Sequence, residues 1–279
     1  MTLILTEVSA AGIAMAADSA ISYFNPNGTI SRVDHKGWRK VLWVPRIRAG
    51  VSYWGFIGQV TRQRFDEWLE ERIRRLQYQD LLGLAQFLAD ELNTKCGNQP
   101  LGPNQCVGIH VAGYHPWADG VRRPTFYHVH NGHGHIQWAG GVPVPALDLQ
   151  GQPSARLLPT NHSWVWDPRK LFAVHYDYPG APATHAAKLA PFNARGYLTR
   201  NGDIGHYILI GEALRNVCTS VNAVPGLRIP SDPTRIGPRL GFLKMEIETA
   251  AAFYKCSTMS RVIGGKVLTL GIRPDETRL

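Results

Sequence analysis

The chain has 279 residues, of which 44% are hydrophobic and 18% are charged. This composition supplies enough apolar material for a large core and argues against a disordered chain. The formal net charge is +9, but the basic residues are scattered and no recognised nucleic-acid-binding motif is present, so we expect no nucleic-acid partner.

The cysteines and the first residues narrow the class of protein further. Four cysteines lie far apart without a CxxC spacing, which is typical of reduced thiols and not of a disulfide framework or a zinc ribbon. The N-terminal stretch lacks a basic segment, and Thr6, Glu7 and Gly12 interrupt its apolar run, so no signal peptide is expected. No run of about eighteen apolar residues exists, so we expect a cytoplasmic protein without a membrane span.

Strand and helix patterns follow one another in blocks along the chain. The first patterns predict strands over 2–8, 13–17, 40–44 and 47–53, and then helices over 55–76 and 80–93. Further strands are predicted over 106–114, 125–130 and 133–138, the last two joined by a tight turn at Asn131-Gly132. Residues 140–200 are rich in Pro and Gly, and helices over 203–221 and 238–255 and a strand over 266–272 follow them.

These blocks of strands and pairs of helices indicate an α+β fold with two sheets and helices packed outside them. The Pro- and Gly-rich stretch shows weak periodicity, which favours a long irregular insertion over a separate domain. We therefore predict a single domain over 1–279 with an insertion at about 140–200.

Thr2 is a candidate nucleophile because of its position. It follows Met1 directly, and removal of the initiator methionine, which is generally permitted before a small residue, would make it the first residue. A threonine hydroxyl is a poor nucleophile alone, but a free α-amino group with a pKa of about 8 can serve as its base near neutral pH. Many proteins begin with Met-Thr, so this junction alone does not identify an enzyme.

The residues that accompany Thr2 form a pattern. Asp18 stands sixteen residues after Thr2, at the end of an apolar run that begins at Gly12. Lys40 then opens an apolar strand, and residues 49–55 form an Ala-Gly-containing strand that ends in glycine before a predicted helix.

Two later motifs continue this order. Residues 124–129 form a strand that begins with proline and precedes a turn, and Gly264-Gly265 precedes the last strand. In order and spacing the motifs resemble the proteasome β-subunit family, including its bacterial proteasome-like homologues, which are N-terminal-nucleophile hydrolases. The resemblance leaves roughly residues 140–200 without a counterpart, and it implies a four-layer αββα sandwich.

The resemblance also implies catalytic roles. The Thr2 hydroxyl oxygen would attack a carbonyl carbon, Lys40 would lower the pKa of that hydroxyl, and Asp18 would hold Lys40 charged and in place. The backbone N–H of Gly55 would stabilise the oxyanion. No cofactor is implied. Taken singly, Asp18 and Gly55 also fit turn residues, and Lys40 also fits a solvated charge on a strand.

The chain departs from the family at some positions. The family usually carries an aspartate a few residues before the Gly-Gly pair, where this chain has Ser260 and Arg261, and a second serine has no clear match near 196–205. Three functions therefore stay open: a threonine peptidase, a ring of the same fold with little activity, and a small-amide hydrolase of the wider class.

A histidine cluster stands outside this resemblance. His128, His130, His133 and His135 flank the Asn131-Gly132 turn, and in a two-residue hairpin all four would lie on one face of the sheet. Four imidazoles can bind zinc or another divalent metal, whereas a solvated histidine-rich hairpin is the alternative.

The peptidase interpretation also implies partners. Homologues of this kind form double rings, so we expect a homo-oligomer of twelve or fourteen subunits, with peptides or unfolded proteins as substrates and an ATPase partner as an open option. In the predicted helix over 55–76, Trp68 and Leu69 are candidate anchors of a buried subunit interface. The neighbouring charges would form its polar rim: Glu70, Glu71, Arg72, Arg74 and Arg75.

Overall fold

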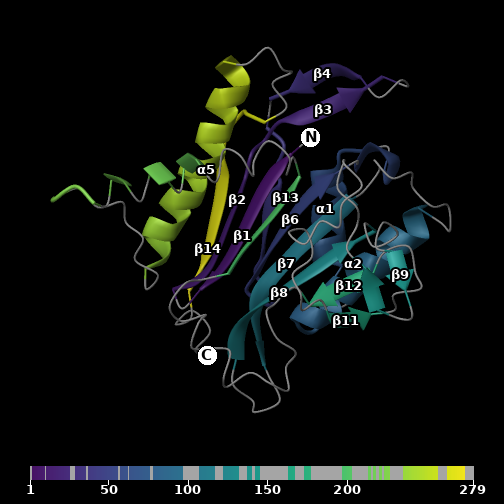
Figure 1. Cartoon of the computed structure of the whole chain (residues 1–279). Coiled ribbons are helices and arrows are strands. Elements are labelled where there is room, and N and C mark those ends of the chain that lie inside the picture. Colours follow the sequence, from purple (N-terminus) through teal and green to yellow (C-terminus); the bar gives the residue numbers. More distant parts are fainter. Residues whose placement is uncertain are drawn as a thin grey trace. The chain divides into compact units, whose positions relative to one another are not determined.

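The computed structural model of the chain is drawn in Figure 1. It describes residues 2–131 except 10, 26–28, 36, 56, 62, 76–77, 97–106 and 117–121. Beyond these it describes 137–139, 142–144, 163–166, 173–176, 197–202, parts of 213–226, 235–256 and 263–273.

Helices and antiparallel sheets make up the described residues, so the predicted α+β class is confirmed. The residues group into two compact units, one formed by 1–54 with 191–279 and the other by 55–190. The single domain over 1–279 and its four-layer arrangement stay predictions. Within the described part of the chain, no helix is both long and apolar enough to cross a membrane.

A four-stranded antiparallel sheet forms the centre of the first unit, in the order β13-β1-β2-β14. Its strands are β1 (Leu3–Ser9), β2 (Gly12–Ala17), β13 (Tyr197–Gly202) and β14 (Leu268–Ile272). Every residue of β1 and β2 is buried, which is typical of strands that are covered on both faces. At Gly12 the φ angle is 123°, and a side chain there would collide with the backbone of Ile272, so the turn between β1 and β2 requires glycine.

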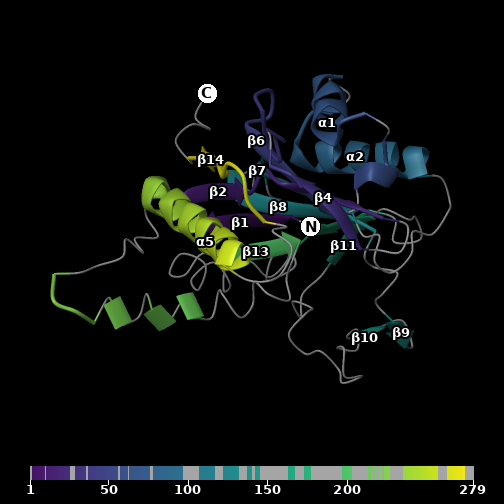
Figure 2. The same ribbon diagram turned by 90° about the horizontal axis from the view of Figure 1, so that it is seen from above.

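The helix α5 (Ile236–Cys256) covers one face of this sheet, as Figures 1 and 2 show. Pro238 lies in its first turn, where the missing N–H removes no helical hydrogen bond. Apolar side chains of α5, of the sheet and of the segment before β14 form one buried core: Leu3, Leu5, Ala14, Ala16, Ile236, Leu243, Ile247, Ala250, Tyr254 and Ile263. Arg239 of α5 also pairs with the buried carboxylate of Glu7 in β1 through two nitrogen–oxygen contacts.

Two hairpins complete the first unit. The strands β5 (Val41–Val44) and β6 (Ala49–Gly55) pair antiparallel, and Gly50 of β6 comes so close to Met15 and Leu270 that a Cβ there would overlap both side chains. The hairpin therefore packs on the sheet face opposite α5, because Met15 and Leu270 alternate with the residues that face the helix. The strands β3 (Ile21–Phe24) and β4 (Ile30–Asp34) form a separate two-stranded sheet that the sequence patterns did not predict.

The second unit contains strands in the order β11-β12-β8-β7 and two helices. Its strands are β7 (Val107–Pro116), β8 (Arg122–His130), β11 (Ser163–Trp166) and β12 (Ala173–Tyr176), and a further pair is β9 (Gln137–Ala139) with β10 (Val142–Val144). A short 3-10 helix, η1 (Ile57–Gln59), precedes α1 (Phe65–Arg74) and α2 (Leu81–Cys96). The Arg72 Nε atom of α1 lies 2.6 Å from Glu91 Oε2 of α2, which ties the two helices together.

Three predictions about elements were wrong. The predicted helix over 55–76 is a 3-10 turn followed by the shorter α1. The stretch 140–200 is not wholly irregular, since β10, β11, β12 and the start of β13 lie within it. The predicted pairing of β8 with residues 133–138 is not formed at His128 and His130, because β8 pairs there with β7 on one edge and with β12 on the other.

The predicted interface anchors have a different role. The side chains of Trp68 and Leu69 are 1% and 0% exposed within the chain itself, so they stabilise this fold and cannot reach another subunit. The neighbouring charges pair along the same helix, Arg74 with Glu70 and Arg75 with Glu71.

Candidate active site

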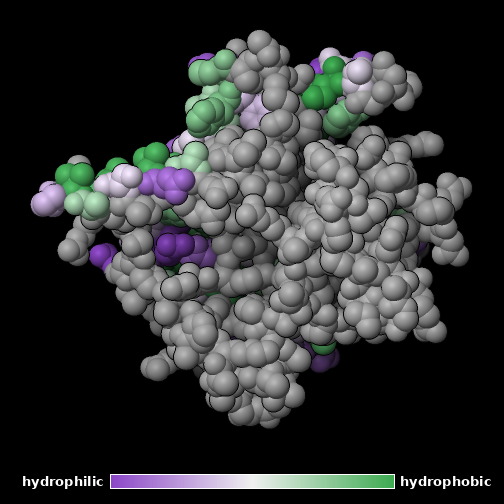
Figure 3. Space-filling view, viewed as in Figure 1, coloured by the Kyte–Doolittle hydropathy of each residue, from purple (hydrophilic) through white to green (hydrophobic). Residues whose placement is uncertain are grey.

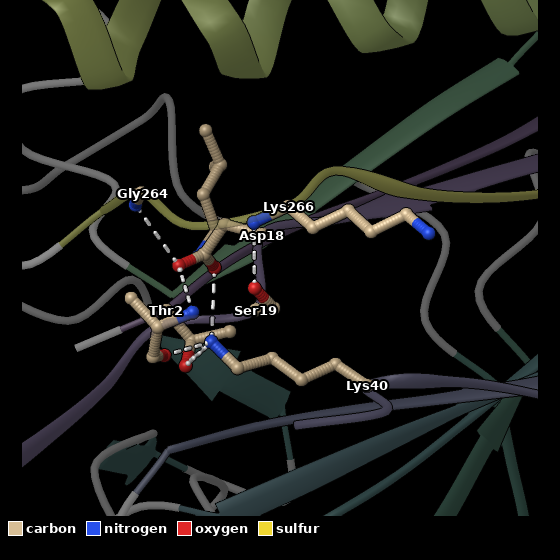
Figure 4. Close-up of polar contacts among 8 residues, drawn as sticks. Thr2, Asp18, Ser19, Lys40, Gly264 and Lys266 are labelled. Atoms are coloured by element: carbon tan, nitrogen blue, oxygen red, sulfur yellow. Dashed lines mark hydrogen bonds and ion pairs between the residues drawn. The ribbon is translucent and has the colours of Figure 1, made fainter. Parts of the chain in front are cut away.

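Thr2, Asp18 and Lys40 meet in the first unit (Figure 4). The Lys40 Nζ atom donates to Thr2 Oγ1 at 2.8 Å, to Asp18 Oδ1 at 3.0 Å, and to the carbonyl oxygen of Ala20. A charged lysine has three N–H donors, so each donor of Lys40 has an acceptor. The structure thus brings together three of the four predicted catalytic residues.

The sequence spacing of Thr2 and Asp18 follows from the β1–β2 hairpin. Ser9 pairs with Gly12 beside the turn and Ile4 pairs with Ala17 at the open end, so the next residues along each strand, Leu3 and Asp18, lie opposite each other. The Asp18 N–H accordingly donates to the Leu3 carbonyl oxygen at 3.2 Å. The sixteen-residue separation is therefore the length of two strands and their turn.

Backbone donors hold the Asp18 carboxylate in place. The Leu3 N–H donates to Oδ1 at 2.9 Å, and the Ala20 and Gly264 N–H groups donate to Oδ2 at 3.1 and 3.3 Å. With the ammonium of Lys40, the carboxylate accepts four hydrogen bonds. Such contacts stabilise the ionised form of an aspartate, which is the form that Lys40 needs as its counter-charge.

Burial determines the electrostatics of the cluster. The exposed fractions of Asp18 and Lys40 are 0%, and that of Thr2 is 4%. Burial lowers the pKa of Lys40 from its ordinary value of 10.5, while the charge of Asp18 and its hydrogen bond act in the opposite direction. The proton of Lys40 is therefore held less tightly than in an exposed lysine, and the charge of Asp18 limits this effect.

Gly55 is the fourth predicted catalytic residue. It is the last residue of β6, it is exposed, and its φ angle of 96° lies in the region that glycine adopts easily. It is also the first residue of the second unit, so its role as an oxyanion donor stays a prediction.

Sequence reasoning missed the contacts that surround Asp18 on its other side. The Ser19 N–H donates to the Gly264 carbonyl oxygen at 3.2 Å, and the Lys266 N–H donates to Ser19 Oγ at 2.8 Å. Figure 4 shows these residues around Asp18, with the Lys266 side chain extending away from Thr2. The Gly264-Gly265 pair was the available signal, because adjacent glycines mark a close approach of backbone.

The predicted metal site is described only in part. The rings of His128 and His130 in β8 lie 4.3 Å apart, and the His128 ring lies 4.9 Å from that of His110 in β7. His133 and His135 lie outside the described residues. Among the residues that are described, no group of three or more His, Cys, Asp or Glu side chains could hold a metal ion. The four-histidine site stays a prediction, and the strand beside His128 and His130 is β12 on one edge of β8 and β7 on the other.

Comparison with known proteins adds no family to this geometry. The chain matches no protein-family model, and no curated protein sequence matches it. The argument for function therefore rests on the cluster of Thr2, Asp18 and Lys40.

Proposed function

We propose that this chain is a threonine peptidase of the N-terminal-nucleophile class, resembling proteasome β subunits, with Thr2 as its nucleophile. The observation that carries the proposal is the 2.8 Å contact between Lys40 Nζ and Thr2 Oγ1. A lysine is seldom fully buried unless it is paired, and here the burial places its ammonium against a hydroxyl and a carboxylate. A lysine whose only role is to keep the protein surface hydrophilic would be exposed, unlike Lys40.

The chemistry requires a free Thr2 amine, so Met1 must first be removed. The Thr2 oxygen then attacks the carbonyl carbon of a peptide bond while its proton passes to the α-amine, and a negative charge develops on the carbonyl oxygen. The leaving amine takes up a proton as the C–N bond breaks, which leaves an ester on Thr2. Water next attacks the ester carbonyl carbon, the carboxylic acid departs, and the Thr2 hydroxyl is restored.

Asp18 has a supporting role in this scheme. Its negative charge keeps Lys40 protonated, so the ammonium can stabilise the negative charge that develops on Thr2 Oγ1 as its proton leaves. The proposal also includes the N–H of Gly55 as the oxyanion donor and the four-layer αββα sandwich of this class. The stacking of α5, the central sheet and the β5–β6 hairpin in the first unit supports that architecture.

Replacement of Thr2 tests the proposal. Thr2→Ala removes the nucleophile but only one small side chain, so we expect intact folding and complete loss of cleavage of fluorogenic peptides. Thr29→Ala is the matched control, because Thr29 is an exposed threonine at the β3–β4 turn, and it should retain full activity. Cleavage by Thr2→Ala at the wild-type rate would show that Thr2 is not the nucleophile. Folded wild-type protein that cleaves no peptide would instead favour a ring with little activity or a small-amide hydrolase.

A further inference from the structure

A short loop formed by Gly264, Gly265 and Lys266 lies against the segment that carries Asp18, and we call it the 264–266 loop. Three hydrogen bonds join the two segments. Gly264 N–H donates to Asp18 Oδ2 at 3.3 Å, Ser19 N–H donates to the Gly264 oxygen at 3.2 Å, and Lys266 N–H donates to Ser19 Oγ at 2.8 Å. Apart from Asp18 itself, Ser19 contributes the only side chain to these bonds.

The fit between the loop and Ser19 is close. A Cβ added at Gly265 would lie 2.4 Å from Ser19 Oγ and 2.8 Å from the His35 carbonyl oxygen. Gly265 also has a φ of 74°, a conformation that disfavours other residues. The loop backbone is therefore held between Ser19 and the chain at His35, and Ser19 itself is only 1% exposed.

The Ser19 hydroxyl connects the 264–266 loop to the segment that carries Asp18. Ser19 stands directly after Asp18, and its hydroxyl accepts a hydrogen bond from the Lys266 N–H. This bond holds the loop in place, and the loop includes Gly264, whose N–H donates to the Asp18 carboxylate. Loss of the Ser19 hydroxyl would release the loop at the point where it is best anchored, and Asp18 Oδ2 would keep only the Ala20 donor.

We propose that Ser19 is a positioning residue that, through the 264–266 loop, holds the Asp18 carboxylate in register with the ammonium of Lys40. It touches none of the reacting atoms. The inference rests on the proposed function, because it assigns to Ser19 a part in preparing Thr2 for attack.

The direction of the effect follows from the forces on Lys40. Burial lowers the Lys40 pKa, and the charge and hydrogen bond of Asp18 raise it. A loosened Asp18 would oppose burial less well, so the pKa of Lys40 should fall further when Ser19 loses its hydroxyl. Asp18→Asn removes the opposing charge altogether and should lower the pKa more.

The experiment measures the Lys40 pKa by NMR on protein labelled at lysine Cε, with the Lys40 signal assigned from Lys40→Met. Ser19→Ala should lower this pKa relative to wild type, in the same direction as Asp18→Asn but by less. Peptide turnover should fall about tenfold in Ser19→Ala, the equivalent of one lost hydrogen bond. Ser31→Ala is the control, because that hydroxyl also donates to a backbone oxygen, that of Tyr23, and it should change neither quantity.

A second variant guards against misfolding of Ser19→Ala. Gly265→Ala disturbs the same contact from the loop side and should shift the Lys40 pKa in the same direction. If Ser19→Ala or Gly265→Ala is folded and its Lys40 pKa equals that of Ser31→Ala, the proposal is wrong. The NMR readout does not depend on turnover. A shifted Lys40 pKa in a protein that cleaves nothing would therefore reject the peptidase and keep the positioning role of Ser19. Unchanged Lys40 pKa values in an active enzyme would reject the positioning role and keep the peptidase.

Discussion

A lysine without exposed surface, such as Lys40, carries a desolvation cost that its neighbours must offset. Here the offset comes from a carboxylate, a backbone carbonyl and a hydroxyl. The first two are sufficient to stabilise a buried charge. The third, Thr2 Oγ1, gives the arrangement a chemical use, because the ammonium favours loss of the proton from the hydroxyl to which it donates.

The pH dependence of stability should reveal the burial of Lys40. Its folded-state pKa lies below its ordinary value of 10.5, so the unfolded chain binds more protons over the range between the two values. The free energy of unfolding should therefore rise as the pH increases from the folded-state pKa towards 10.5. At a pH below the folded-state pKa, Lys40 is charged in both states, and the full cost of burying the charge remains. Lys40→Met lacks this contribution, so wild type should gain stability relative to the variant as pH rises. Urea unfolding at a series of pH values measures the difference.

The matched control for this experiment is Lys244→Met. Lys244 lies on α5 and its side chain is 53% exposed, so its replacement removes one positive charge from the surface and leaves the buried charges unchanged. A difference between wild type and Lys40→Met that is flat with pH would contradict the lowered pKa of Lys40.

At the scale of elements, the ion pair between Glu7 and Arg239 fixes α5 on β1. The Glu7 side chain is 2% exposed and that of Arg239 is 14% exposed, so the pair is largely removed from water. Arg239→Ala would leave a buried carboxylate without its cation, and we expect a loss of about 3–5 kcal/mol in the free energy of unfolding. Chemical denaturation followed by circular dichroism provides the measurement.

An exposed pair on another helix is the control for that prediction. The Arg74 side chain is 74% exposed and pairs with Glu70 one turn away, so Arg74→Ala should change the free energy of unfolding by less than about 0.5 kcal/mol. Similar losses in the two variants would show that the Glu7–Arg239 pair does not anchor α5.

The strongest sequence patterns predicted elements well. The apolar runs of β1, β2, β7 and α5 gave nearly correct bounds, because these segments are buried and their composition reflects it. The β3–β4 hairpin was missed because polar residues such as Ser31 and Arg32 are exposed on β4. The strand β13 was missed because it ends in Arg200-Asn201-Gly202 and owes its place to pairing with β1.

The candidate site likewise contains some residues that could be predicted from the sequence and others that could not. Thr2, Asp18 and Lys40 were predicted from the resemblance to a known family. Only the separation of Thr2 and Asp18 follows from one short hairpin, in which sequence distance reflects position in space. The contact between Ser19 and Lys266 joins residues 247 apart in the chain, and no local pattern reports it. The partner of β8 was not predicted for a related reason, since β8 pairs with β12, which lies more than 40 residues further along the sequence.

At the scale of the whole molecule, we propose the double ring of twelve or fourteen subunits that the family resemblance implies. Trp68 and Leu69 are buried in the chain and cannot anchor it. Among the described residues, exposed large hydrophobic side chains are few: Trp43, Val217, Val224 and Phe253. Figure 3 shows hydrophobic and hydrophilic residues intermixed around α5 and the β3–β4 hairpin, with no continuous apolar patch among the coloured atoms.

Light scattering coupled to size exclusion tests this assembly. A ring of twelve or fourteen copies should elute as one species at that multiple of the 31.0 kDa chain. It would confine the Thr2 sites and so keep folded proteins away from them. A single species near the mass of the monomer would contradict the ring and favour a small-amide hydrolase.

The most direct test of the central claim is to trap the nucleophile and locate it by mass spectrometry. Wild-type protein treated with a β-lactone, which acylates reactive threonine hydroxyls, should lack Met1 and carry one ester on Thr2. Lys40→Met should carry far less, because its threonine hydroxyl has lost the neighbouring ammonium that favours loss of its proton. An intact Met1, or a label on any residue other than Thr2, would contradict the account.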